Sequence, residues 1–297
     1  MSTLRCFLWV CAAWTSLTPV LVQARAWPAP KFESAPCPTA VSASIDAAAL
    51  SGVQCGHVEV PEHYFRARAK RLRVFVVIAK TEAQKPGTPV LFVAGGPGQA
   101  LSAISGQVFG TGVMGRVRAD RDIVLIDPRG AGFSEPRLRC PPPAPAQPAT
   151  GPLSPLQQDA VHCAEALSAQ DIDLSAYNTL NLARDLWSVR TALGLPKVIL
   201  YAVSYGGFLG LQALRGAEHW VESAVLLSMP RPQGGSVLYS ADTAQGALEA
   251  FNAQCLAQPA CAAYGDFRSN LNELFGRLRA QPIELQLPSP DGQSSSA

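Results

Sequence analysis

The chain has 297 residues, of which 48% are hydrophobic and 15% are charged, and its formal net charge is +2. This length allows one large domain or two modest ones, and the hydrophobic content is sufficient for a substantial core. The near-neutral charge lacks the basic character of nucleic-acid-binding proteins, so we expect no nucleic-acid partner.

The first 26 residues have the pattern of a secretory signal peptide. Arg5 precedes an apolar stretch over residues 6–22, and small residues offer cleavage sites near Ala24 and Ala26. The alternative is a membrane anchor, but two hydroxyl residues and a proline interrupt a stretch that is already short for a bilayer span. We therefore expect a secreted or periplasmic protein without a stable membrane anchor.

Export would place the six cysteines beyond the signal peptide in an oxidising compartment, where an even number favours disulfides. Several connectivities are possible, and short loops close at the least entropic cost. The predicted disulfides are therefore Cys37–Cys55, Cys140–Cys163 and Cys255–Cys261. The sequence has no CxxC pair and its histidines are scattered, so we expect neither a metal site nor a cofactor.

Strands are predicted at residues 55–61 and 72–79, and two short, wholly apolar strands follow at 89–94 and 123–126. Wholly apolar strands are typical of buried positions in a parallel sheet. The proline-rich residues 27–39 and 137–155 are predicted to lie along the surface and to form a loop, respectively.

A helix is predicted over residues 179–193, with Asn178 or Thr179 as its cap and Gly194 as its end. A β-favouring run over 198–203 then stops abruptly at Ser204, and a helix-like segment begins near Phe208. Residues 224–227 form one more apolar strand. Strands that alternate with helices indicate an α/β fold with a mostly parallel central sheet.

The strand, sharp turn and helix around Ser204 are typical of a nucleophile elbow, which holds a serine hydroxyl out from the edge of an α/β sheet. An ordinary serine at the end of a strand is the alternative. Two other strands also run straight into glycine-bearing loops, namely Gly95-Gly96-Pro97-Gly98 and Asp127-Pro128-Arg129-Gly130-Ala131-Gly132-Phe133-Ser134.

Together, these three loops resemble those of the prolyl iminopeptidases and tripeptidyl aminopeptidases, the exopeptidase branch of the α/β-hydrolases. Tyr177, Asp185 and Ser204-Tyr205-Gly206-Gly207 follow in the order typical of that family, and the resemblance covers about residues 37–288. Two positions depart from it: Ala202 replaces the usual glycine of the elbow, and Ala94 replaces the usual histidine before the oxyanion loop.

The resemblance implies a serine hydrolase of α/β-hydrolase fold that acts on short peptides with a free N-terminus. Ser204 would be the nucleophile, and the backbone amides of Tyr205 and Gly96 would hold the oxyanion. The remaining site-supporting residues are Gly95, Pro97, Gly98, Asp127, Arg129, Gly206 and Gly207. Asp127 and Arg129 are expected in a hydrogen-bonded turn under the site, and Asp185 is expected on a solvated or ion-paired helix face. The sequence indicates no oligomeric state.

In this fold the catalytic acid and then the histidine follow the serine. His219 is the only histidine after Ser204, and it is expected at the far end of the following helix. We therefore expect an incomplete fold: a signal peptide (1–26), the N-terminal part of the core (27–235), a partial cap (236–288) and an unstructured tail (289–297). We also expect impaired catalysis; the alternatives are an esterase or lipase on the same fold and a non-catalytic remnant.

Overall fold

The computed structural model describes residues 28–66, 69–93, 95–110, 112–142, 154–216, 219–230, 239–283, 286–288 and 294–296. The chain divides into two compact units, Met1–Met229 and Pro230–Ala297. The predicted signal peptide and Ala94 lie outside the described residues.

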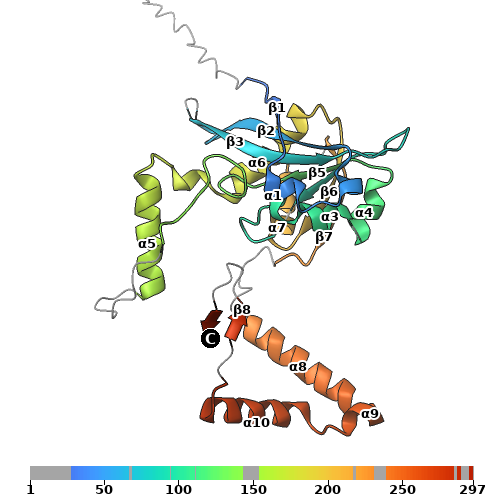
Figure 1. Cartoon of the computed structure of the whole chain (residues 1–297), viewed down its shortest axis with the longest axis vertical. Helices are drawn as coiled ribbons and strands as arrows, with labels where there is room; N and C mark the ends of the chain where they lie inside the picture. The colour runs from blue at the N-terminus through green and yellow to red at the C-terminus, as the bar shows by residue number, and fades with distance from the viewer. Residues whose placement is uncertain are drawn as a thin grey trace, which may run out of the picture. The chain divides into compact units, whose positions relative to one another are not determined.

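The described part of the first unit is built on one seven-stranded sheet (Figure 1). Its strands are β1 (Phe32–Ala35), β2 (Val53–Pro61), β3 (Arg71–Ala79), β4 (Val90–Val93), β5 (Ile123–Ile126), β6 (Val198–Val203) and β7 (Val221–Leu227), in the order β1-β2-β3-β5-β4-β6-β7. Strands β5, β4, β6 and β7 run parallel, whereas β1, β2 and β3 pair antiparallel at the other end. The predicted α/β fold with its central, largely parallel sheet is confirmed.

Each face of the sheet carries its own layer of helices. On one face, α6 (Thr179–Ala192) and α7 (Tyr205–Leu214) pack on side chains of β3 such as Val74 and Val76. On the other, α1 (Thr39–Ser42), α3 (Ser105–Gly110) and α4 (Gly112–Arg118) pack on Phe75 and Val77 of the same strand. The alternation follows from the two-residue period of a strand, and both faces are apolar because both are covered. The remaining elements of this unit are α2 (Ala47–Leu50), η1 (Ser102–Ile104), α5 (Pro155–Ser168) and η2 (Leu174–Ala176).

Helix α6 begins and ends where the sequence predicts. Of the two candidate caps, Asn178 is the one used, because its side-chain oxygen accepts the Asn181 amide at 3.0 Å. Gly194 follows the helix with a φ of 65°, a conformation that glycine adopts at little cost.

Two segments have secondary structure that the sequence does not predict. Residues 32–35, expected only to lie along the surface, form the edge strand β1 against β2. Helix α5 extends over residues for which the sequence pattern makes no prediction, and it starts with a capping box between Ser154 and Gln157 and a proline at its first turn.

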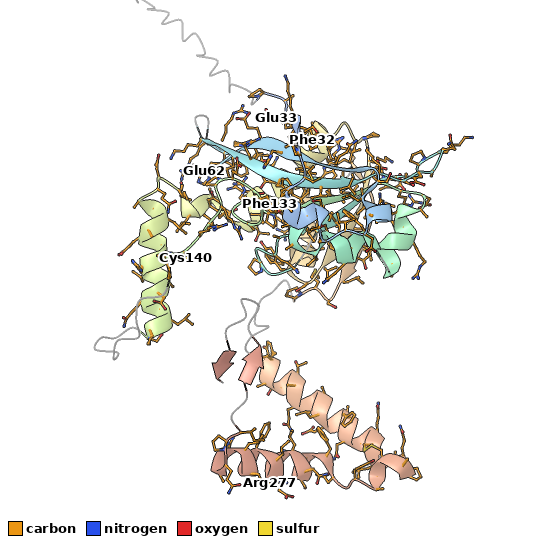
Figure 2. The ribbon with its side chains drawn as sticks, in the orientation of Figure 1. Phe32, Glu33, Glu62, Phe133, Cys140 and Arg277 are labelled. Carbon is orange, nitrogen blue, oxygen red and sulfur yellow. A yellow bond between two sulfur atoms is a disulfide. The ribbon has the colours of Figure 1, made fainter. Side chains whose placement is uncertain are left out.

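Three disulfides join the pairs predicted from the sequence. Cys37 is bonded to Cys55 on β2, Cys140 to Cys163 on α5, and Cys255 to Cys261 in the second unit. Figure 2 shows Cys140 beside α5. Each bond closes a loop within one unit.

The described part of the second unit consists of α8 (Ser240–Leu256), α9 (Pro259–Ala262), α10 (Phe267–Ala280) and a ribbon of β8 (Gln286–Pro288) with β9 (Ser294–Ser296). Phe251 on α8 meets Phe267 on α10 with ring centroids 5.0 Å apart. The tail expected to be unstructured lies mostly outside the described residues, and its described part is β9. None of the helices in the described ranges is both long and apolar enough to span a bilayer.

Candidate active site

Ser204 occupies the sharp turn between β6 and α7. Its backbone has φ 57° and ψ −125°, a left-handed conformation that few residues other than glycine adopt. The Ser204 amide donates to the Leu227 carbonyl at the end of β7 (2.8 Å), and the Gly207 amide donates back to the Ser204 carbonyl (2.9 Å). Neighbouring strand and helix therefore hold the strained turn from both sides.

The glycine-proline loop after β4 lies directly against Ser204. A methyl group added to Gly95 would come 3.0 Å from Ser204 Cβ and 3.3 Å from its Oγ, closer than ordinary contact distances, so a side chain there would crowd the hydroxyl. Gly96 and Gly98 have φ values of 107° and 87°. A side chain on Gly96 would also meet the Gly98 amide at 2.8 Å, so this bend in the loop requires glycine.

Helix α7 approaches the sheet closely because of its glycines. A methyl group on Gly207 would lie 2.9 Å from Met229 Cβ, and one on Gly210 would lie 3.3 Å from Ala202 Cβ. Ala202 is fully buried. The methyl group that Ala202 adds to the elbow is thus accommodated opposite a helix position with no side chain.

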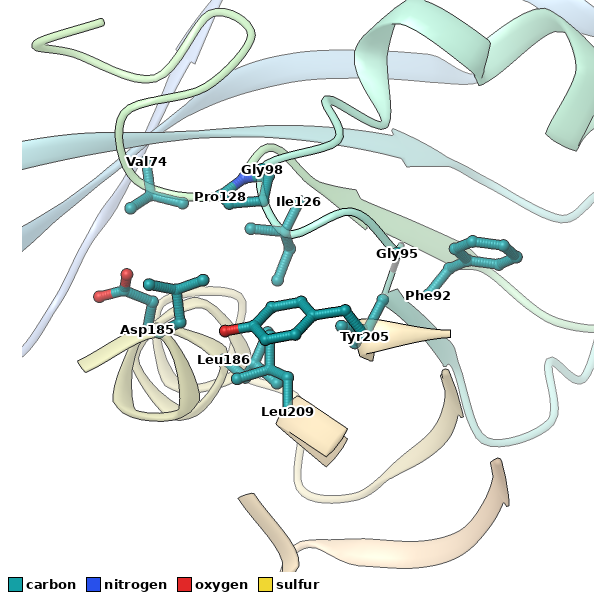
Figure 3. A pocket seen from close by; sticks show the side chains of 12 residues that line it. Val74, Phe92, Gly95, Gly98, Ile126, Pro128, Asp185, Leu186, Tyr205 and Leu209 are labelled. Atoms are coloured by element: carbon teal, nitrogen blue, oxygen red, sulfur yellow. The ribbon is translucent and has the colours of Figure 1, made fainter. Parts of the chain in front are cut away.

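A small apolar pocket lies beside the turn, at the carboxyl ends of the strands (Figure 3). Its lining includes Gly95 and Gly98 from the glycine-proline loop, Pro128 from the loop after β5, and Leu186 and Tyr205 from the helices. The Tyr205 ring crosses this pocket in Figure 3, and its hydroxyl pairs with Thr179 Oγ1 at 2.8 Å. The Tyr205 backbone is thereby fixed next to Ser204.

Asp127 is buried in the turn after β5, where N–H and O–H groups surround its carboxylate. It accepts bonds from the Ser102 amide (2.8 Å), the Ser102 hydroxyl (2.6 Å) and the Phe133 amide (2.9 Å). The Ser134 hydroxyl donates to the Asp127 carbonyl (2.8 Å). Burial raises the pKa of Asp127 above its ordinary value, against the opposing effect of these hydrogen bonds.

Arg129 has no exposed side-chain surface, and each of its bonds is made to another part of the unit. Two go to Asp185 on α6, at 2.8 and 2.7 Å. Three more go to the carbonyls of Pro61, Glu62 and Ala176. Burial lowers the pKa of Arg129, but the Asp185 carboxylate more than offsets this, so the guanidinium stays charged.

The sequence allows either a solvated or an ion-paired helix face for Asp185, and the solvated alternative is wrong. The Asp185 side chain is 4% exposed and forms an ion pair with Arg129. Tyr64 donates a further bond to Asp185 at 2.8 Å. Burial, and next the charge of Asp185, raise the pKa of the Tyr64 hydroxyl, which keeps it a donor. No sequence pattern points to Tyr64, Glu62 or Ser102, because each contacts its partner across a large separation along the chain.

The four histidines lie at separate places in the described structure. His57 Nε2 contacts the Phe133 carbonyl at 3.2 Å, and His63 Nε2 lies 3.0 Å from Asp173. His162 is on α5, and His219 is exposed beyond the far end of α7. Within the described residues, no hydrogen bond joins Ser204 Oγ to a histidine, and no group of three or more His, Cys, Asp or Glu side chains could hold a metal.

Comparisons with known proteins agree with this geometry. Residues 88–276 match the α/β hydrolase fold family. The chain is 28% identical over 257 residues to a tripeptidyl aminopeptidase of Streptomyces lividans, covering 79% of this chain and 47% of the relative. It is 26% identical to the serine protease Hip1 of Mycobacterium tuberculosis (71% and 43% covered) and 30% identical to a probable proline iminopeptidase of Streptomyces coelicolor (42% and 28% covered).

The chain belongs to the α/β-hydrolase family, as the resemblance of its three loops predicts. Its curated relatives include serine peptidases. The chain spans about half the length of the first of these relatives.

Proposed function

We propose that this protein is an exported serine peptidase that removes residues or short peptides from the N-termini of peptide substrates. The observation that carries the proposal is the contact between the strained Ser204 turn and Gly95. It brings a serine hydroxyl and a loop of backbone amides together at the carboxyl edge of the sheet. The names of the similar proteins, tripeptidyl aminopeptidase and proline iminopeptidase, favour an exopeptidase.

Each proposed catalytic group has a defined task. Ser204 attacks the scissile carbonyl and forms an acyl-enzyme, which water then hydrolyses. The amides of Tyr205 and Gly96 donate to the oxyanion of the tetrahedral intermediate, and losing one such donor typically costs about 3–4 kcal/mol of transition-state stabilisation. Pro97 has no N–H to donate, and its ring restricts the bend that presents the neighbouring amides.

Export is supported by the three disulfides, which persist in oxidising compartments, and by the pattern of residues 1–26. We further propose that residues 27–235 contribute to the hydrolase core and residues 236–288 to a cap.

The test compares the wild-type protein with its variants. We expect a fluorophosphonate probe to label the wild type but not Ser204→Ala, and the wild type to cleave arylamides of short peptides that have a free N-terminus. Gly95→Ala should reduce labelling by roughly 10- to 100-fold, because its methyl group would meet the Ser204 side chain.

Gly216→Ala is the matched control, because a methyl group there meets nothing within 4 Å. Labelling that persists in Ser204→Ala would refute the assignment of the nucleophile. Cleavage of p-nitrophenyl esters without any cleavage of the arylamides would instead identify an esterase.

A further inference from the structure

The loop that carries Gly96 is tied at its far end to Asp127. The loop leaves β4 at Gly95 and reaches Ser102, whose amide and hydroxyl both donate to the Asp127 carboxylate at 2.8 and 2.6 Å. Ser102 and Asp127 are each only 1% exposed. The same carboxylate accepts the Phe133 amide, so one buried side chain joins the loop after β4 to the turn after β5.

We propose that Asp127 and Ser102 are positioning residues that hold the Gly96 amide at the correct place beside Ser204. This inference rests on the proposed function, since it concerns the oxyanion donor of that reaction.

Apart from the ring of Pro97, the glycine-proline loop has few side chains that could fix its conformation. Gly96 and Gly98 carry no side chains, and a methyl group on Gly98 would meet nothing within 4 Å. Ordering a residue costs backbone entropy, and glycine loses the most, so a glycine-bearing loop needs an anchor at each end. Strand β4 is one anchor. The other is Leu101 in the core together with the paired bonds at Ser102.

The chemistry of the anchor requires a carboxylate. Three donors point at its two oxygens, and an asparagine would offer only one acceptor oxygen and turn an NH₂ group toward the remaining donors. The turn is also closed tightly around it, because a methyl group on Gly132 would lie 1.9 Å from Asp127 Oδ2. Among the described residues, the nearby guanidinium of Arg129 is bonded to Asp185 and not to Asp127. The carboxylate of Asp127 is therefore held in place by the same N–H and O–H groups, from Ser102 and Phe133, that it is proposed to position.

The experiment compares the wild-type protein with three single variants, Asp127→Asn, Ser102→Ala and Ser102→Thr. Ser188→Ala is the matched control: Ser188 is also buried (3% exposed) and hydrogen-bonded, but its partner is Tyr64. Hydrogen exchange of peptides covering residues 95–104 measures the order of the loop. The rate of fluorophosphonate labelling, together with kcat and KM on a peptide arylamide, measures the oxyanion site.

We expect Asp127→Asn and Ser102→Ala to accelerate exchange of this segment and to lower both labelling and kcat by roughly 10- to 100-fold, with KM nearly unchanged. Ser102→Thr restores a hydroxyl and should recover most of the loss, while Ser188→Ala should change neither readout. Ser102→Ala removes only one of the three bonds, so it keeps the test available if Asp127→Asn does not fold.

Unchanged exchange, or unchanged labelling despite faster exchange, would overturn the positioning role while leaving the hydrolase proposal intact. A wild-type protein that the probe does not label would refute the proposed function, and the positioning role with it.

Discussion

Replacement of Arg129 by leucine is predicted to be among the most destabilising single changes in the first unit. The substitution leaves the Asp185 carboxylate, 4% exposed, without its cationic partner. It also removes the Arg129 donor from the carbonyls of Pro61, Glu62 and Ala176, of which Ala176 keeps a second donor in Asn181. These groups come from the end of β2, from η2 and from α6, so the substitution removes bonds from three segments of the unit.

The magnitude follows from the burial. Breaking a buried ion pair by removing one partner costs about 3–5 kcal/mol, and each buried acceptor left without a donor adds up to about 1–3 kcal/mol. Typical domains have a total stability of about 5–15 kcal/mol, so a loss of about 4 kcal/mol or more, which is expected here, would leave the unit marginal. Lysine at the same position keeps the charge but not the forked geometry, and we expect it to recover only part of the loss.

Urea unfolding followed by tryptophan fluorescence measures this change selectively, because Trp187 and Trp220 belong to the first unit and no tryptophan of the sequence follows residue 229. Arg66→Ala is the control, since Arg66 is 60% exposed and pairs with the half-buried Asp173; we expect a loss below about 1 kcal/mol. The double variant Arg129→Leu with Asp185→Leu should regain part of the stability, because no unpaired charge remains although the carbonyls still lack the Arg129 donor. A loss from Arg129→Leu no larger than that from Arg66→Ala would refute the reasoning.

Three further predictions concern other parts of the chain. Gly132→Ala should lose at least about 2 kcal/mol more than Gly112→Ala in the same urea assay; both positions have positive φ, but a methyl group on Gly112 meets nothing within 4 Å. Equal losses would contradict the expected clash between that methyl group and Asp127. Replacing Cys255 and Cys261 together by serine should cost the second unit roughly 2 kcal/mol, seen in far-UV circular dichroism, while the tryptophan transition stays in place. Hydrogen bonds from Ser175, and after it from His63 and Arg66, hold the pKa of Asp173 well below its ordinary value. The contribution of the Asp173 carboxylate to stability is therefore present above about pH 3.9 and is lost as the pH falls through the lowered pKa. The difference in unfolding free energy between wild type and Asp173→Asn should accordingly shrink in acid titration, and a constant difference from about pH 7 to about pH 2 would argue against it.

The contact between Ser204 and Gly95 could be predicted because of how parallel strands place their ends. Both residues directly follow wholly or largely apolar runs, which form β4 and β6, and these strands are neighbours in the sheet. The carboxyl ends of neighbouring parallel strands lie at the same edge, so glycine-bearing loops after such strands converge. The short spans between successive cysteines likewise sufficed to predict the disulfides.

The partners of the buried polar groups could not be predicted in the same way. Asp185 stands on a helix whose apolar spacing is evident, but the spacing does not reveal that Arg129, 56 residues earlier, is bonded to it. Ser102 lies 25 residues before Asp127 in a stretch with no motif. Edge strand β1 escapes prediction because its four residues have no β-favouring pattern and depend on pairing with β2.

At position 204, the residue that best stabilises the backbone conformation differs from the residue that the proposed reaction needs. A residue with a side chain in that conformation costs the folded state on the order of 1–3 kcal/mol, and glycine would largely remove that cost. The residue that makes the turn most durable is thus one that cannot attack a carbonyl. A library screened only for survival at high temperature should drift toward glycine there and become inert, whereas one screened for turnover should retain the hydroxyl and gain its robustness elsewhere.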